Sequence, residues 1–168
     1  MNAFTVAIIS SLASLVAFRV GEGEFRLSLG LVAMIVLLER YREIPAILTS
    51  IFAGLFVFLM RILSFRITGG DVGGDLLFSY SLEIAFYIVY GLSYNFLVRL
   101  EKPKEKMPLM LLLMLCDFAA NSTEYFLRFI ALKETANHVG FLTIFMAAFA
   151  RSAVIWLLSE FVFPRKEA

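Results

Sequence analysis

Several residue types on which metal sites and disulfide frameworks depend are scarce in this chain of 168 residues. It has one cysteine, Cys116, which excludes a disulfide within the chain and a multi-cysteine metal site. Its one histidine, His138, lies in the stretch KETANHVG, whereas a zinc site needs three or four ligands. We therefore expect no metal ion, and we interpret His138 as a solvated loop residue.

Signatures of nucleotide chemistry are also missing. The sequence has neither a Walker loop nor a GxGxxG motif, and it contains no recognisable nucleophile–base set. The formal net charge is only +1, which argues against a nucleic-acid partner. We expect no catalytic residue and no cofactor, so any enzyme activity associated with this protein would lie outside the chain.

Charge is scarce and apolar residues are abundant. Charged residues make up 17% of the chain and apolar residues 61%, with a mean hydropathy of +0.86. A soluble domain is typically about 25% charged and about 45–50% apolar. The composition therefore predicts an integral membrane protein in contact with the lipid bilayer.

The apolar segments predict an all-α, polytopic fold in which residues 1–168 form a single transmembrane domain. A membrane-spanning helix needs about 20 residues, and the second of our six predicted helices is short. The predicted transmembrane helices are residues 3–20, 27–38, 44–65, 76–98, 108–132 and 141–163.

The lysine and arginine residues near the ends of these helices and between them predict the orientation. One side of a six-helix bundle would hold eight of them, in the loops 39–43 and 99–106 and in the tail after residue 163. The other side would hold five. We therefore expect a multi-pass protein of the cell membrane with both termini cytoplasmic. The glycine-rich loop 67–75 would then face outside.

A polar stripe interrupts the apolar run of the fifth helix. Asp117, Asn121, Glu124 and Arg128 are spaced four, three and four residues apart, so they share one face over about 16 Å. A charge facing lipid at the bilayer centre costs at least about 2.5–3.5 kcal/mol. The stripe is therefore predicted to face the bundle interior or a water-filled cavity.

Opposite charges elsewhere offer partners for this stripe. From matched depth and opposite sign we predict that Glu124 pairs with Arg151 and that Arg61 pairs with Glu83. Two interpretations are open: an ion-pair network that fixes helix packing, or a ligand pocket open to the outside. The candidate ligand-binding or interior polar residues are Arg61, Glu83, Tyr87, Tyr90, Asp117, Asn121, Glu124, Arg128 and Arg151. Tyr94 continues the face that Glu83, Tyr87 and Tyr90 share.

Small residues recur at four-residue spacing on two of the predicted helices, a pattern that lets helices approach closely. Internal packing and docking of a partner membrane subunit both explain it. The residues are Ala3, Ala7, Ala13 and Ala17 on the first helix and Ala46, Ser50 and Gly54 on the third.

The order of these elements resembles the N-terminal membrane region of a group of sensor histidine kinases from Gram-positive bacteria. The segments that carry the resemblance are EFRLSLG (24–30), IFAGLFVFLMRIL (51–63), LEIAFYIVYG (82–91), CDFAANSTEYFLR (116–128) and ARSAV (150–154). The resemblance implies a membrane-embedded sensory module with a polar pocket in the outer half of the bundle. It also implies a cytoplasmic kinase domain and a homodimer.

The layout is also similar to the substrate-binding S-components of energy-coupling-factor vitamin transporters. Those are six-helix proteins with cytoplasmic termini and alanine-xxx-alanine faces that dock a transmembrane partner. In this alternative Ala3, Ala7, Ala13 and Ala17 form the analogous face, and the outer polar residues bind a small molecule. A third alternative, a structural accessory subunit, predicts that every interior charge is neutralised and that no cavity remains.

Overall fold

The computed structural model describes residues 1–19, 26–71, 73–100, 107–132 and 141–164. Our prediction for His138, and the basic stretches 101–106 and 165–168 used for the orientation, lie outside these residues. Whether both termini are cytoplasmic therefore stays a prediction.

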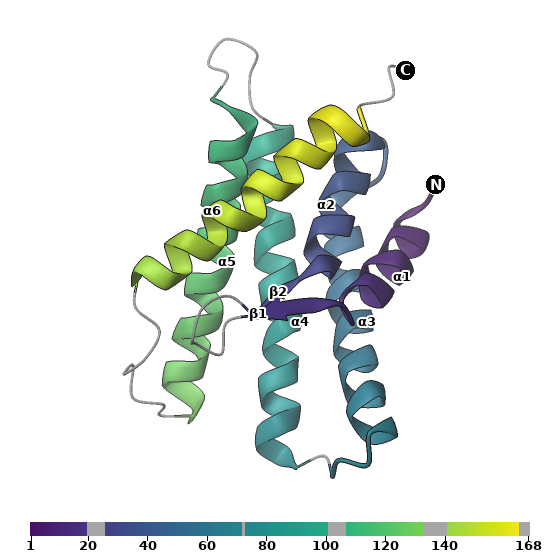
Figure 1. Cartoon of the computed structure of the whole chain (residues 1–168), viewed down its shortest axis with the longest axis vertical. Coiled ribbons are helices and arrows are strands. Elements are labelled where there is room, and N and C mark those ends of the chain that lie inside the picture. The colour runs from purple at the N-terminus through teal and green to yellow at the C-terminus, as the bar shows by residue number, and fades with distance from the viewer. Residues whose placement is uncertain (20–25, 72, 101–106, 133–140, 165–168) are drawn as a thin grey trace.

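Helices dominate the described chain, which confirms the all-α class apart from one small hairpin (Figure 1). Two short π-helical turns, η1 and η2, extend α4 and α6. The elements are α1 (Ala3–Ala13), β1 (Ala17–Arg19), β2 (Arg26–Ser28), α2 (Leu29–Arg40), α3 (Ala46–Ile67), α4 (Gly74–Tyr94), η1 (Asn95–Arg99), α5 (Leu109–Leu132), α6 (Phe141–Leu157) and η2 (Leu158–Val162).

The first predicted helix, residues 3–20, is too long. α1 has 11 residues, and antiparallel pairing of β1 with β2 places Ala17 opposite Ser28. The backbone N–H of Leu29 also donates to the carbonyl of Val16. Apolar periodicity does not reveal this hairpin, because its strands are stabilised by hydrogen bonds to each other across the loop between them. Residues 27 and 28 likewise belong to β2, so α2 begins at Leu29.

Three helices in the described residues are long and apolar enough to cross a membrane: Ala46–Ile67, Gly74–Arg99 and Ile144–Val162. α1 and α2 have 11 and 12 residues, below the length of about 17–25 that a span requires. α5 has 24 residues but carries the polar stripe. The structure is consistent with a membrane protein, whereas the predicted six-span bundle is not confirmed.

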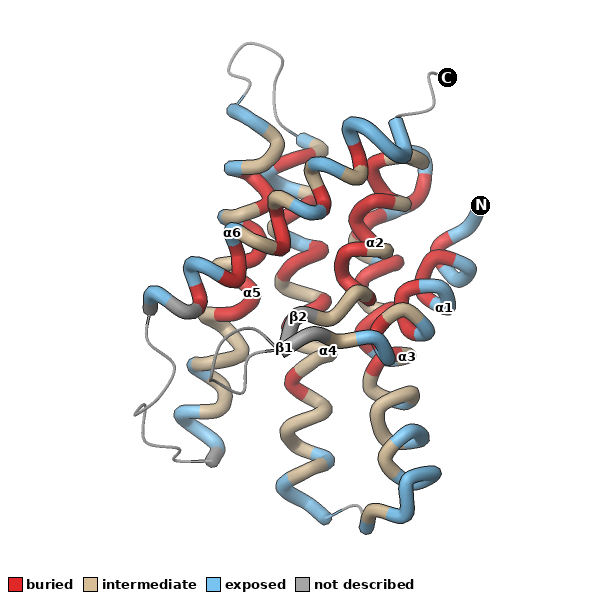
Figure 2. The backbone as a smooth tube through the Cα atoms, viewed as in Figure 1, coloured by how far each residue is buried: buried red, intermediate tan, exposed pale blue. Residues whose placement is uncertain are grey.

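The packing centres on α4, which lies between α3 and α5 (Figure 1). α1 packs against both α2 and α3, and α6 crosses α5. The most deeply buried residues lie mainly in the half of the bundle away from the α3–α4 turn (Figure 2). The fully buried core includes Met34, Ile35, Val57, Tyr90 and Leu113.

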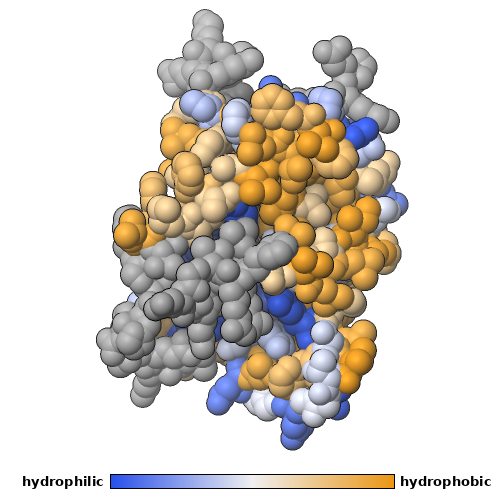
Figure 3. All heavy atoms as spheres, viewed as in Figure 1, coloured by the Kyte–Doolittle hydropathy of each residue, from blue (hydrophilic) through white to orange (hydrophobic). Residues whose placement is uncertain are grey.

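Large apolar side chains cover much of the outer surface. Phe4, Leu59, Phe126 and Leu142 are each more than half exposed. Orange apolar atoms dominate the upper half of the face in Figure 3, whereas hydrophilic residues gather toward the lower half. An apolar exterior of this kind suits contact with lipid, since a soluble monomer rarely exposes such a surface.

The small residues that the sequence singled out lie inside the bundle. Ala46, Ser50 and Gly54 are buried where α3 meets α4. A Cβ built on Gly54 would stand 3.1 Å from the Cα of Ile84, and one built on Gly91 would overlap Ser50. Internal packing therefore explains this pattern.

The same holds for most of the small face on α1. Ala3 and Ala7 are buried, Ala13 is partly buried and Ala17 belongs to β1. The hydroxyl of Ser10 donates to the carbonyl of Gly30 at 2.7 Å. This face packs against the rest of the bundle.

Gly91→Ala tests the close approach of α3 and α4. The new methyl group would overlap Ser50, so we expect the free energy of unfolding to fall by about 1–3 kcal/mol. Ser50→Gly in the same chain removes the obstruction and should restore part of the loss. Gly74→Ala is the control, because a Cβ there meets nothing within 4 Å. Thermal unfolding in detergent is the measurement, and equal midpoints for both alanine variants would contradict the packing argument.

Candidate functional site

The charged residues predicted for the interior are arranged in three ion pairs. Arg61 Nε lies 3.1 Å from Glu83 Oε1, joining α3 to α4. Arg151 Nη1 lies 3.0 Å from Asp117 Oδ2, joining α6 to α5. In the third pair, Glu124 Oε1 accepts from Arg128 Nη2 at 2.8 Å and from its Nε at 3.1 Å. Each of the three carboxylates therefore has an arginine within ion-pair distance, as low-dielectric surroundings require.

The predicted partners are half right. The Arg61–Glu83 pair is confirmed, but the prediction that Glu124 pairs with Arg151 is wrong. Glu124 pairs with Arg128 one turn further along α5, and Arg151 pairs with Asp117. The depth count assumed parallel helices, whereas α6 runs obliquely across the others (Figure 1). That tilt brings Arg151 to the level of Asp117.

The pair between Asp117 and Arg151 is the most deeply buried of the three. Their side chains are 0% and 5% exposed. The amide of Asn121 donates to the backbone carbonyl of Asp117 at 2.9 Å and to its carboxylate. The guanidinium of Arg151 stands 5.4 Å from the ring centre of Phe86 on α4. This cluster ties α4, α5 and α6 together through charge and hydrogen bonding.

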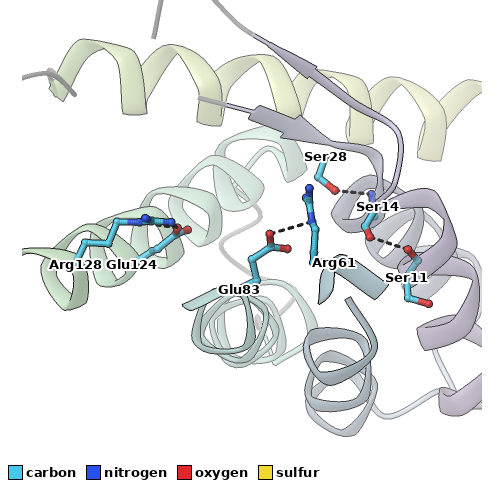
Figure 4. Close-up of polar contacts among 8 residues, drawn as sticks. Ser11, Ser14, Ser28, Arg61, Glu83, Glu124 and Arg128 are labelled. Atoms are coloured by element: carbon cyan, nitrogen blue, oxygen red, sulfur yellow. Dashed lines mark hydrogen bonds and ion pairs between the residues drawn. The ribbon is translucent and has the colours of Figure 1, made fainter. Parts of the chain in front are cut away.

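The pair between Arg61 and Glu83 lies nearer the α3–α4 turn and is less enclosed. The two side chains are 16% and 23% exposed. The nearby charges of Glu124 and Arg128 on α5 act on Glu83 with opposite signs. Figure 4 shows Arg61 reaching from α3 toward the β1–β2 hairpin, with Glu83 beside it and the Glu124–Arg128 pair on the neighbouring helix.

A cavity of about 340 Å³ opens beside Arg61. Its wall combines the last two turns of α3 with Tyr80 of α4 and with residues at and before β1. The lining residues are Leu15, Ala17, Arg61, Ser64, Phe65, Thr68 and Tyr80. Of the nine predicted pocket or network residues, only Arg61 lines this cavity.

The tyrosines of α4 belong to the core. Tyr87 and Tyr90 are buried and neither lines the cavity. Their spacing correctly predicted a shared inward face, but a phenol face packs against apolar side chains as readily as it lines a pocket. Tyr80, which does line the cavity, was not predicted, although it lies on α4 three residues before Glu83.

A second buried polar cluster, at the opposite end of α4, was missed. Tyr94 donates to Glu39 Oε1 at 2.6 Å, and Arg42 lies 3.4 Å from Glu39 Oε2. Arg99 donates to the carbonyls of Leu38 and Ile44. The sequence predicts a loop at residues 39–43, whereas Glu39 belongs to the last turn of α2 and is 1% exposed. The extension of the α4 polar face to Tyr94 was the available signal.

Among the described residues there is no group of three or more histidine, cysteine, aspartate or glutamate side chains that could hold a metal ion. Glu83, Asp117 and Glu124 instead face arginines. Their arrangement is suited to charge pairing and to binding of polar groups.

Comparisons with protein-family models, with curated proteins and with solved structures find no match for this chain.

Replacing Arg151 tests the buried pair. Arg151→Met leaves the carboxylate of Asp117 buried without its partner, so we expect a loss of about 3–5 kcal/mol in the free energy of unfolding. Asp117→Asn/Arg151→Gln removes both charges and should recover much of that loss. Unfolding midpoints in detergent provide the comparison, and a double variant less stable than Arg151→Met would refute the pairing argument.

Tyr94→Phe tests the cluster around Glu39. It leaves a buried carboxylate oxygen without its phenol donor, so we expect a loss of about 1.5–3 kcal/mol in the free energy of unfolding. Tyr125→Phe is the control, because Tyr125 is only partly buried and lies outside this cluster. Equal thermal midpoints for the two variants would show that the hydrogen bond adds nothing to stability.

Proposed function

We propose that this chain is the membrane-embedded sensing module of a bacterial signalling system, with a histidine kinase domain as its cytoplasmic output. The observation that supports it is the Arg61–Glu83 pair beside the cavity. A ligand that contacts Arg61 acts directly on a charge pair between two long helices. A purely structural role for this ion pair would not explain the open cavity beside it.

Contacts also join α4 to the last helix. Phe86, three residues after Glu83 on α4, has its ring centre 5.4 Å from the guanidinium of Arg151 on α6, and Arg151 pairs with Asp117 on α5. Beyond α6, the guanidinium of Arg40 stands 5.7 Å from the ring centre of Phe163, which follows η2. A change in the Arg61–Glu83 pair would therefore meet a series of contacts that ends near Phe163, beyond which the proposed kinase domain would lie.

The proposed mechanism is a shift between two arrangements of the polar interior. A ligand biases such an equilibrium only through different affinities for the two states. Ligand bound beside Arg61 would change its pairing with Glu83, and the α5–α6 pair would carry the change to the last helix. Homodimerisation, as expected from the resemblance to sensor kinases, would place two such helices together.

The S-component alternative is less well supported, because Ala3 and Ala7 are buried inside this chain and offer no face to a partner subunit. The accessory-subunit alternative is supported by the three neutralising ion pairs, but it does not account for the cavity.

Gene expression in the native host tests the sensing role. The strains carry the wild-type gene, an in-frame deletion, or Asp117→Asn/Arg151→Gln, which removes the charge pair joining α5 to α6. We expect the deletion to change a confined set of genes by several-fold. In the strain with the double variant, the transcripts of the same genes should stay at a constant level under conditions that change their level in the wild type. RNA sequencing gives the readout, and immunoblotting of membranes checks the amount of protein.

Glu124→Gln/Arg128→Gln is the matched control, because it removes an ion pair of the same size that lies within one helix. It should respond as the wild type does. A normal response from the α5–α6 variant at normal abundance would contradict the sensing mechanism. Loss of uptake of a nutrient in the deletion strain, with no change in gene expression, would favour the transporter alternative.

A further inference from the structure

Among the described residues that line the cavity, Arg61 is the one charged side chain. Arg61, Ser64 and Thr68 are spaced three and four residues apart, so they lie along one face of α3. The Thr68 hydroxyl already donates to the carbonyl of Phe65 at 2.8 Å, whereas Ser64 is exposed. The described lining therefore offers a ligand three kinds of donor: the guanidinium of Arg61, the hydroxyl of Ser64 and the phenol of Tyr80.

The geometry of Arg61 leaves part of its guanidinium for such a ligand. Its Nε faces Glu83, and the 3.1 Å ion pair joins that nitrogen to Oε1. A guanidinium has five N–H donors in a planar fork that matches carboxylate and phosphate oxygens. The terminal nitrogens can therefore bind an anion while Nε keeps its contact with Glu83.

The cavity wall also contains apolar and aromatic side chains. Phe65 and Tyr80 pack edge to face, with ring centres 6.5 Å apart, and Leu15 lies in the same wall. The volume of about 340 Å³ is near the lower end for small-molecule sites. A ligand that fills it would have a short apolar portion in addition to its charge.

We propose that this cavity binds an anionic amphiphile, with its phosphate or carboxylate on Arg61 and Ser64 and its apolar part against Phe65, Tyr80 and Leu15. The proposal names the ligand class for the sensing module and in that respect rests on the proposed function. The cavity extends to Thr68, the residue that follows α3, and so lies at the end of a helix long and apolar enough to cross a membrane. An anionic lipid headgroup and a water-soluble amphiphilic anion both supply this chemistry.

Ligand-dependent thermal stability of the full chain in dodecyl maltoside tests the proposal. The soluble probe is hexyl phosphate, with hexanol as the neutral match. The lipid probe is phosphatidylglycerol in mixed micelles, with phosphatidylcholine as the match. We expect the unfolding midpoint to rise with at least one anionic probe and not with its match. A rise with phosphatidylglycerol alone identifies a lipid headgroup, whereas a rise with hexyl phosphate identifies a soluble anion.

Two variants locate the binding. Arg61→Gln/Glu83→Gln removes the guanidinium without leaving a lone carboxylate, and we expect the apparent affinity to fall at least about tenfold, as for loss of a charge-assisted hydrogen bond. Ser64→Asp adds a negative charge at an exposed position in the cavity wall and should abolish binding of an anion. It provides an independent test if Arg61→Gln/Glu83→Gln fails to fold. Glu124→Gln/Arg128→Gln should bind as the wild type does, because neither residue lines the cavity.

Equal stabilisation by charged and neutral probes, or unchanged affinity in Ser64→Asp, would overturn the proposal. These results are separable from those of the expression experiment. Anion binding without a transcriptional response would refute the sensing role and leave the site in place. A transcriptional response without anion binding would keep the sensing role and refute the ligand class.

Discussion

The requirement that every interior charge meet its opposite governs this structure. A carboxylate such as Asp117, which is fully buried, costs several kcal/mol to remove from water, and Arg151 and Asn121 offset that cost. Because these partners come from different turns and helices, satisfying the charge also decides where α6 crosses α5. The Glu39–Tyr94 contact has the corresponding effect between α2 and α4. Polar residues that look costly in an apolar sequence thus specify which helices are neighbours.

Close packing of small residues complements these polar contacts. At Gly91 the surface of α4 has no side chain, and Ser50 of α3 fills that space. At Gly30 a Cβ would stand 2.6 Å from the hydroxyl of Tyr87 and 2.7 Å from Cβ of Ser14, so α1, α2 and α4 converge there. Lipid tails are as apolar as the helices themselves, so association in a bilayer depends on such close packing and on hydrogen bonds.

The two ends of the bundle differ in a way that bears on function. The end that contains Glu39, Tyr94 and Arg99 is extensively buried and hydrogen-bonded (Figure 2). The end near the α3–α4 turn is less buried, and there the Arg61–Glu83 pair lies beside a cavity. Binding sites are commonly found where rigid elements support a less tightly packed region. The proposed ligand site therefore lies at the less tightly packed end.

Sequence alone determined the helical class, the apolar exterior and the inward direction of the polar stripe. Composition and spacing are sufficient for these, because the cost of exposing charge to lipid depends only on which face a residue occupies. It also identified Arg61 and Glu83 as partners. Tertiary structure decided that α1 ends at Ala13, that Asp117 is the partner of Arg151, and that the cavity borders Arg61 and Tyr80 and not Tyr87. These outcomes depend on how helices tilt and on contacts between distant segments, whereas residue spacing reports the geometry of one helix at a time.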